Sequence, residues 1–104
     1  GVALTIHYPS IPLMAAAENF ALAYTFPGGA SDNLLYFGAN VTLIGELSIN
    51  HQTLLYDPQS SGGLLLAVPQ EIAAEFQAEA NSRSIPVWQI GSVSEGSGIT
   101  ILAG

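Results

Sequence analysis

The chain has 104 residues, of which 49% are hydrophobic and 9% are charged, and its formal net charge is −7. The chain has eight acidic residues, a single arginine, Arg83, and no lysine. This composition excludes nucleic-acid binding, because affinity for a phosphate backbone needs clustered cations. No apolar run reaches the roughly 18 residues of a membrane span, and the lack of cysteine excludes disulfides, thiolate metal sites and cysteine nucleophiles. We therefore expect a single small cytoplasmic domain. Its low content of charged residues suggests that a partner buries part of its surface.

The first half of the chain predicts a strand, a helix and an irregular region. Residues 2–8 are apolar and partly β-branched, which is typical of a strand. Ser10 is placed to cap a helix over residues 13–24, and apolar residues surround that helix, so it should be largely buried. The stretch "PGGASDN" at 27–33 predicts a loop. A short strand over residues 34–37 and an extended or irregular stretch over residues 41–47 complete this half.

A short helix, a loop and an apolar run follow. Residues 49–56 favour the helix, and "DPQSSGG" at 57–63 favours the loop. The run "GLLLAV" at 63–68 is continuous and apolar, so it predicts a central strand covered on both faces of the sheet.

The last part of the chain carries the clearest helix signal. Residues 69–84 begin with a proline, and Ile72, Phe76 and Ala80 form an apolar stripe that should face the core, together with Trp88. A strand over 86–93, the turn "EGSG" and the strand "ITIL" predict a closing hairpin. Strands and helices are thus mixed, which predicts an α+β fold with helices packed on a mixed sheet.

Two blocks resemble the C-terminal domain of the selenophosphate synthetases (selenide, water dikinases). "DPQSSGGLLLAVP", starting at Asp57, is similar to that family's Asp-Pro-Gln-Thr-Ser-Gly-Gly loop and the strand after it, with Ser60 in place of the usual threonine. "PGGASDN", starting at Pro27, is similar to the family's Pro-Gly-Gly-Thr-x-x-Asn segment, with Ala30 in place of threonine. The ending "IGSVSEGSGITIL" is similar to the family's closing hairpin, so the resemblance covers nearly the whole chain.

The resemblance implies a fold like the C-terminal domain of aminoimidazole ribonucleotide synthetase. Residues 1–104 would be a single C-terminal-type domain fragment, truncated at its start, because the family's Thr-Asp-Val-Thr-Gly-Phe-Gly segment is missing. The N-terminal ATP-binding domain, with the family's cysteine or selenocysteine and its essential lysine, is absent from this sequence.

For a full-length enzyme the resemblance implies synthesis of selenophosphate from selenide and ATP, with Mg²⁺ required. We expect no cofactor in the fragment itself and no activity from it alone. Its expected role is to wall the active-site cleft and to pack against the N-terminal ATP-binding domain of the same chain, within a homodimer, with no nucleic-acid or membrane partner.

The resemblance also implies two loops at the cleft. The substrate-cleft or phosphate-facing loop comprises Asp57, Gln59, Ser60, Ser61, Gly62 and Gly63, and the second cleft loop comprises Gly28, Gly29 and Asn33. Consecutive backbone N–H groups in the first loop suit a phosphate, but Asp, Pro, Ser and Gly are also ordinary turn residues, so both interpretations stay open. No catalytic residue and no metal ligand is expected.

The remaining polar residues favour structural interpretations. His7 and His51 have no further histidine or cysteine with which to form a metal site. Asp32 and Asp57 are better interpreted as solvated turn carboxylates than as a shared Mg²⁺ site. Two alternative functions remain: a related ATP-dependent enzyme of the aminoimidazole ribonucleotide synthetase type, and a stand-alone, non-catalytic dimerisation or regulatory module.

Overall fold

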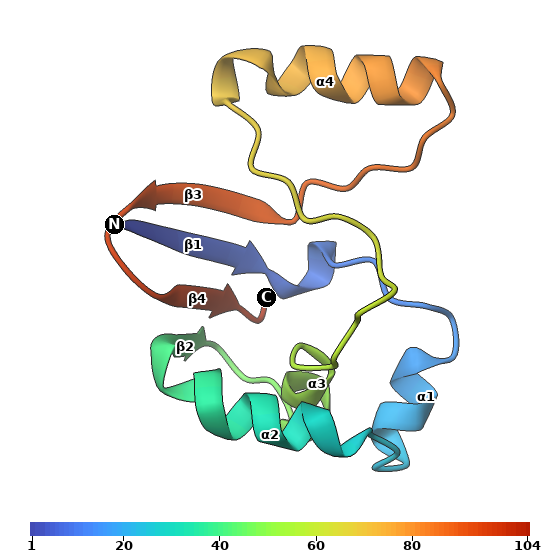
Figure 1. The fold of residues 1–104 in the computed structure, drawn as a ribbon, viewed down its shortest axis with the longest axis vertical. Coiled ribbons are helices and arrows are strands. Elements are labelled where there is room, and N and C mark those ends of the chain that lie inside the picture. Colours follow the sequence, from blue (N-terminus) through green and yellow to red (C-terminus); the bar gives the residue numbers. More distant parts are fainter.

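A mixed four-stranded sheet lies at the centre of the molecule in the computed structural model, which describes all 104 residues (Figure 1). Its strands are β1 (Val2–His7), β2 (Val41–Ile44), β3 (Gly91–Glu95) and β4 (Ile99–Leu102), in the spatial order β2-β4-β1-β3. β4 runs parallel to both β1 and β2, whereas β3 runs antiparallel to β1. Helices accompany this sheet, so the predicted α+β class with a mixed sheet is confirmed.

The expected hairpin of the last two strands is wrong, because β1 lies between β3 and β4. The turn at residues 96–98, which connects β3 to β4, crosses the N-terminal end of β1. There the Leu4 N–H donates to the Gly98 carbonyl at 3.0 Å, and the Gly96 N–H donates to the Gly1 carbonyl at 3.3 Å. Gly96 and Gly98 have φ values of 134° and 78°, which residues with a side chain rarely adopt. Inserting β1 supplies it with a hydrogen-bonded neighbour on each side, which a simple hairpin would not do.

Four helices accompany the sheet: α1 (Ala17–Leu22), α2 (Gly28–Phe37), α3 (Ile49–Leu54) and α4 (Gln70–Ser82), with single 3-10 turns at Tyr8–Ser10 and Gly38–Asn40. The predictions for α3 and α4 are confirmed. Ser48 caps α3, because its Oγ accepts the His51 backbone N–H at 3.3 Å. α4 begins after Pro69. No helix in the structure is both long enough and apolar enough to cross a bilayer.

The first helix is shorter and more exposed than predicted. Ser10 belongs to the 3-10 turn that starts at Tyr8, and α1 begins only at Ala17, without a side-chain cap. A helix of six residues offers little more than one face for burial, and here only Ala21 is buried, while Met14 before the helix is 85% exposed. The expectation of a largely buried helix over 13–24 is therefore wrong.

The predicted loop at 27–33 and strand at 34–37 are also wrong, because together they form helix α2. Pro27 is extended, with φ −65° and ψ 149°, and directs the chain into the helix. Gly29 and Asn33 then contact the segment around Pro58, and Ala30 is buried. These tertiary contacts outweigh the turn preference of glycine, aspartate and asparagine.

The apolar run 63–68 has no regular secondary structure and does not form the predicted central strand. None of its backbone groups is hydrogen-bonded within the chain, and Leu64 is 87% exposed. A strand requires a hydrogen-bonded neighbour, and both neighbours of β4 and of β1 are already present in the sheet. The strand expected over 86–93 likewise begins only at Gly91, where a Cβ atom would overlap the Thr5 carbonyl.

The core is small for a chain of this length. Only six of the 104 residues are buried: Ala21, Ala30, Asn50, Thr53, Ala80 and Ile101. The core positions predicted for Ile72 and Trp88 are wrong, because these side chains are 46% and 56% exposed. α4 stands away from the sheet in Figure 1, and of its predicted apolar stripe Ala80 is buried, Phe76 is partly buried and Ile72 is exposed. The chain exposes 7635 Å², whereas a folded monomer of its mass exposes about 5,500 Å².

Candidate functional site

The two segments that carry the family resemblance lie together in space. Nδ2 of Asn33 donates a hydrogen bond of 2.9 Å to the carbonyl oxygen of Tyr56, immediately before Asp57. At Gly29, a Cβ atom would lie 3.1 Å from Cγ of Pro58, so the missing side chain permits close approach of the two segments. Gly28, Gly29 and Asn33 are thus on the first turns of α2 rather than on a loop. Gly29 and Asn33 meet the segment around Asp57, whereas Gly28 has no neighbour there.

Asp57 lies where two open pockets meet. One pocket of about 290 Å³ is lined by Asn33, Phe37, Asn40, Val41, Leu55, Tyr56, Asp57 and Ile99. A second pocket of about 350 Å³ is lined by Ala17, Phe20, Thr25, Phe26, Pro27, Leu54 and Asp57. Both are walled chiefly by apolar side chains, and Asp57 is the one residue that they share and the one charged residue in either.

The rest of the "DPQSSGG" loop is a surface turn. The Gly62 N–H donates to the Gln59 carbonyl at 3.2 Å, and a Cβ atom on Gly62 would lie 3.2 Å from Cβ of Gln59. Nε2 of Gln59 also reaches Oδ2 of Asp57 at 3.5 Å, which is a weak contact. Ser60, Ser61 and Gly63 are exposed, and their backbone N–H groups have no acceptor in the chain.

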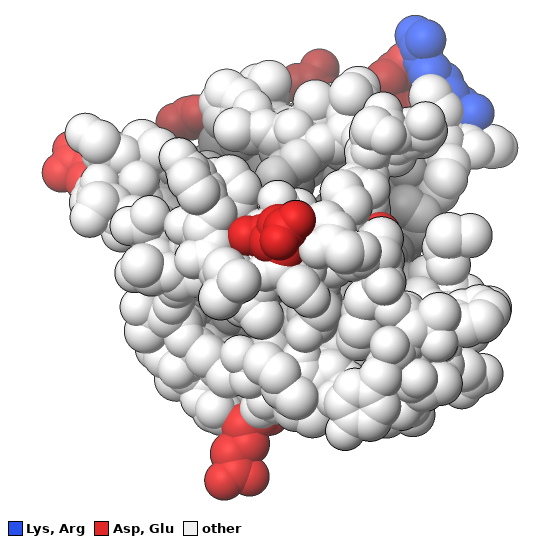
Figure 2. Space-filling model, turned by 60° about the horizontal axis from the view of Figure 1, so that its bottom comes forward, with Lys and Arg blue, Asp and Glu red and all other residues white.

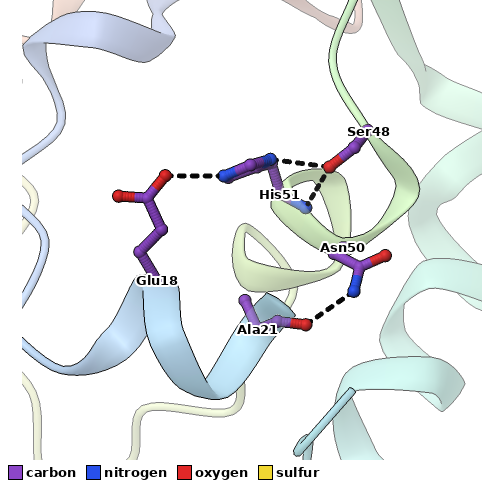
Figure 3. Close-up of polar contacts among 5 residues, drawn as sticks. All are labelled: Glu18, Ala21, Ser48, Asn50 and His51. Carbon is purple, nitrogen blue, oxygen red and sulfur yellow. Dashed lines mark hydrogen bonds and ion pairs between the residues drawn. The ribbon is translucent and has the colours of Figure 1, made fainter. Parts of the chain in front are cut away.

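A second polar cluster joins α1 to α3, and no local pattern in the sequence indicates it. His51 reaches Ser48 Oγ through Nδ1 at 2.6 Å and Glu18 Oε1 through Nε2 at 2.9 Å (Figure 3). Because an ionised carboxylate only accepts, this geometry suits a histidine that donates from Nε2 and accepts the Ser48 hydroxyl at Nδ1. Nearby, Asn50 donates to the Ala21 carbonyl at 2.6 Å and is itself buried.

The serine–histidine–glutamate order in this cluster is that of a hydrolase triad, but the surroundings assign it a structural role. Ser48 is the helix cap of α3, and one of its lone pairs already accepts the His51 backbone N–H. Ser48 lines neither of the two pockets at Asp57, so its hydroxyl is separate from the site that the family segments form. His51 therefore links two short helices that are distant in sequence.

Two tyrosines near these elements have raised pKa values. Burial, and to a smaller extent the negative charge of Glu18, raises the pKa of Tyr8, whose ring packs edge-on against His51 with centroids 6.1 Å apart. The Tyr8 hydroxyl oxygen is buried without a hydrogen-bond partner. Burial also raises the pKa of Tyr56, which lines the first pocket. Both phenols are therefore held more firmly in the neutral form than free tyrosine.

The residues of this chain do not fit ATP or Mg²⁺ as a self-contained site. Nowhere do three histidine, aspartate or glutamate side chains come together around a common point. The one arginine, Arg83, lies at the end of α4, pairs with Glu79 at 2.7 Å and lines neither of the Asp57 pockets. We assign no step of phosphate chemistry to these residues.

Comparison with known proteins supplies the family. No protein-family model matches the chain. The selenide, water dikinase of Photorhabdus laumondii is 39% identical over 95 residues, which is 91% of this chain and 26% of that protein. The enzyme of the same name from Carboxydothermus hydrogenoformans is 36% identical over 93 residues, covering 89% of this chain and 27% of the protein. This chain is homologous to part of the selenide, water dikinases.

The match to selenide, water dikinases lies in their C-terminal portion, as the sequence resemblance predicted. The Clostridioides difficile protein repeats the pattern at 33% identity over 88% of this chain and 27% of its own length. The chain thus spans about a quarter of the length of the relatives it matches. The roles predicted for the two cleft segments stay predictions, although the structure brings those segments together.

Proposed function

We propose that this chain forms the C-terminal part of a selenophosphate synthetase, an enzyme that makes selenophosphate from selenide and ATP with Mg²⁺. The observation that carries the proposal is the meeting of the two family segments at Asp57, through the bond from Asn33 to Tyr56. The side chain of Asn33, a residue of the family pattern, bonds to the backbone of a residue 23 positions away, directly before the second family segment. Such contacts support a shared role in shaping one surface.

In this proposal the chain supplies a cleft wall and a domain interface, and the reactive groups lie in another part of the protein. Support comes from the exposed surface, which exceeds that of a folded monomer by about 2,100 Å². Each partner in a stable interface typically contributes about 800 Å², and obligate interfaces contribute more. The radius of gyration of 14.9 Å also exceeds the roughly 13 Å of a compact chain of this length.

The apolar character of that surface supports the same role. Eighteen large hydrophobic side chains are exposed, among them Leu64, Leu65 and Leu66 at 87%, 73% and 56%. Figure 2 shows one face of the molecule on which charged side chains are few and far apart. A surface of this kind fits a permanent interface with the N-terminal ATP-binding domain of the same protein, within a dimer.

A chimera tests the proposal. This chain replaces the matching quarter of the Photorhabdus laumondii selenide, water dikinase, and AMP formation is measured with and without selenide. We expect the chimera to form AMP only when selenide is present, and the isolated 104-residue chain to form none. A chimera that folds as well as its parent but forms no selenide-dependent AMP contradicts the family assignment. Turnover by the isolated chain contradicts the proposal that the reactive groups lie in another part of the protein.

A further inference from the structure

Asp57 differs from every other carboxylate in the chain. It is half-buried, whereas the side chains of the other seven acidic residues belong to exposed residues. It also lines both pockets, whose remaining walls contain no charge. Its one hydrogen bond with another side chain is the 3.5 Å approach of Gln59 Nε2, which is too long to satisfy a partly buried carboxylate.

No arginine, lysine or histidine of the chain forms an ion pair with Asp57. Arg83 is bonded to Glu79 at 2.7 Å, and His51 is bonded to Glu18 at 2.9 Å. There is no lysine, and the net charge of −7 leaves the surface with a large excess of carboxylates. A counter-charge for Asp57 therefore has to come from a different molecule or from another part of a longer protein.

The walls around Asp57 specify the form of that cation. Phe37, Val41 and Ile99 line the first pocket, and Phe20 and Phe26 line the second pocket. A strongly hydrated ion such as Mg²⁺ gains nothing from apolar walls and prefers several oxygen ligands. An arginine side chain fits better, because its aliphatic stem packs on apolar surface and its planar fork pairs with one carboxylate.

We infer that Asp57 and the two pockets form a docking surface for an arginine carried by a polypeptide segment with apolar neighbouring side chains. The guanidinium pairs with the Asp57 carboxylate, and the neighbouring apolar side chains occupy the two pockets. This inference departs from the phosphate-facing role expected for Asp57, since a carboxylate repels phosphate. It rests on the proposed function only for the source of the segment, which would be the rest of the same protein.

The test is a titration of the ¹⁵N-labelled chain, followed by NMR, with the peptide acetyl-Leu-Arg-Leu-amide. The neutral matched probe is acetyl-Leu-citrulline-Leu-amide, which keeps the shape and loses the charge. We expect the arginine peptide to shift the amide signals of residues that line the two pockets, and to bind on the order of tenfold more tightly than the citrulline peptide.

Two variants and one salt complete the test. Asp57→Asn should remove the preference for arginine, while Asp32→Asn, which neutralises an exposed carboxylate on α2, should leave it unchanged. Equal binding of both peptides to the unaltered chain overturns the inference, as does an unchanged preference in Asp57→Asn. Shifts around Asp57 with MgCl₂ alone and none with the peptide also overturn it. None of these outcomes involves selenide, so failure of this inference leaves the proposed function, which is tested by selenide-dependent AMP formation, unaffected.

Discussion

The side-chain amide of Asn33 donates to the backbone carbonyl of Tyr56 across 2.9 Å, and this bond connects α2 to the residue that precedes Asp57. Asn33, Tyr56 and Asp57 all line the first pocket, so the bond lies within the wall that it helps to shape. Because the acceptor is a main-chain atom, the contact depends on the path of the backbone and not on the identity of residue 56. Asn33 thereby fixes where the "DPQSSGG" loop begins.

Asn33→Ala should lower the free energy of unfolding by about 1–2 kcal/mol, because a partly buried carbonyl loses its donor. Asn33→Asp should cost at least as much, since a carboxylate would face that carbonyl oxygen. Urea denaturation followed by circular dichroism measures both. Asn19→Ala is the matched control, because Asn19 is exposed and its side chain makes no hydrogen bond in the structure. Equal losses for Asn33→Ala and Asn19→Ala would show that the bond adds nothing.

Two adjacent glycines offer an internal comparison at the beginning of α2. A Cβ atom on Gly28 would meet nothing within 4 Å, whereas one on Gly29 would lie 3.1 Å from Cγ of Pro58. Alanine is favoured over glycine in helices by up to about 1 kcal/mol, so Gly28→Ala should be neutral or stabilising. Gly29→Ala should be less stable than Gly28→Ala by about 1 kcal/mol, because the Pro58 ring has to move. Thermal unfolding of the two variants side by side decides this, and a Gly29→Ala protein as stable as Gly28→Ala would exclude a tight contact.

Tyr8→Phe should stabilise the chain by about 1 kcal/mol, because it removes a buried hydroxyl oxygen that has no partner. The pH dependence follows from the raised pKa values of Tyr8 and Tyr56. Above about pH 10 the unfolded chain loses the phenol proton while the folded chain retains it, so stability is present below that pH and falls as the pH rises further. In Tyr8→Phe this alkaline loss should be smaller, with the part due to Tyr56 remaining.

The measurement for Tyr8 is urea denaturation at pH 8, 10 and 11. Tyr24→Phe serves as the control, because Tyr24 is 75% exposed and its hydroxyl is hydrated in both states. An alkaline loss of stability that is the same in Tyr8→Phe as in the unaltered chain would contradict the burial of this phenol.

Local sequence patterns predicted those elements whose ends are marked by proline, a cap residue or a run of β-branched residues. α4 after Pro69 and α3 after Ser48 are examples, and the strand at residues 2–8 is another. The start of α2 was missed because Gly28, Gly29 and Asp32 favour turns locally, and the contacts with residues 56–58 that stabilise the helix are distant in sequence. The pairing of β1 with both β3 and β4 is equally non-local, so no short-range signal distinguishes it from a hairpin.

At the candidate site, the residue types in the two family segments predicted two cleft segments but not how these segments are arranged. The meeting of Gly29 with Pro58 and of Asn33 with Tyr56 depends on the fold. The link from Glu18 to His51 was missed because no spacing relates residues 33 positions apart on two different helices. The partial burial of Asp57 was also invisible, since "DPQSSGG" has the composition of a solvated turn.

The exposed leucines at residues 64–66 should make the isolated chain associate with itself. They are 87%, 73% and 56% exposed, and the backbone of this segment has no hydrogen-bond partner, so it can pair with an identical segment of another molecule. Replacing all three with serine should change the free energy of unfolding of the isolated chain by less than about 1 kcal/mol, because little buried surface is lost. Sedimentation velocity at several concentrations should show concentration-dependent association of the unaltered chain and less association of the variant. The same replacement at exposed Val2 and Met14, with serine in each case, is a matched control that removes apolar area elsewhere. A chain that is monomeric at every concentration, or a control that lowers association as much as the leucine variant, would show that residues 64–66 do not mediate self-association.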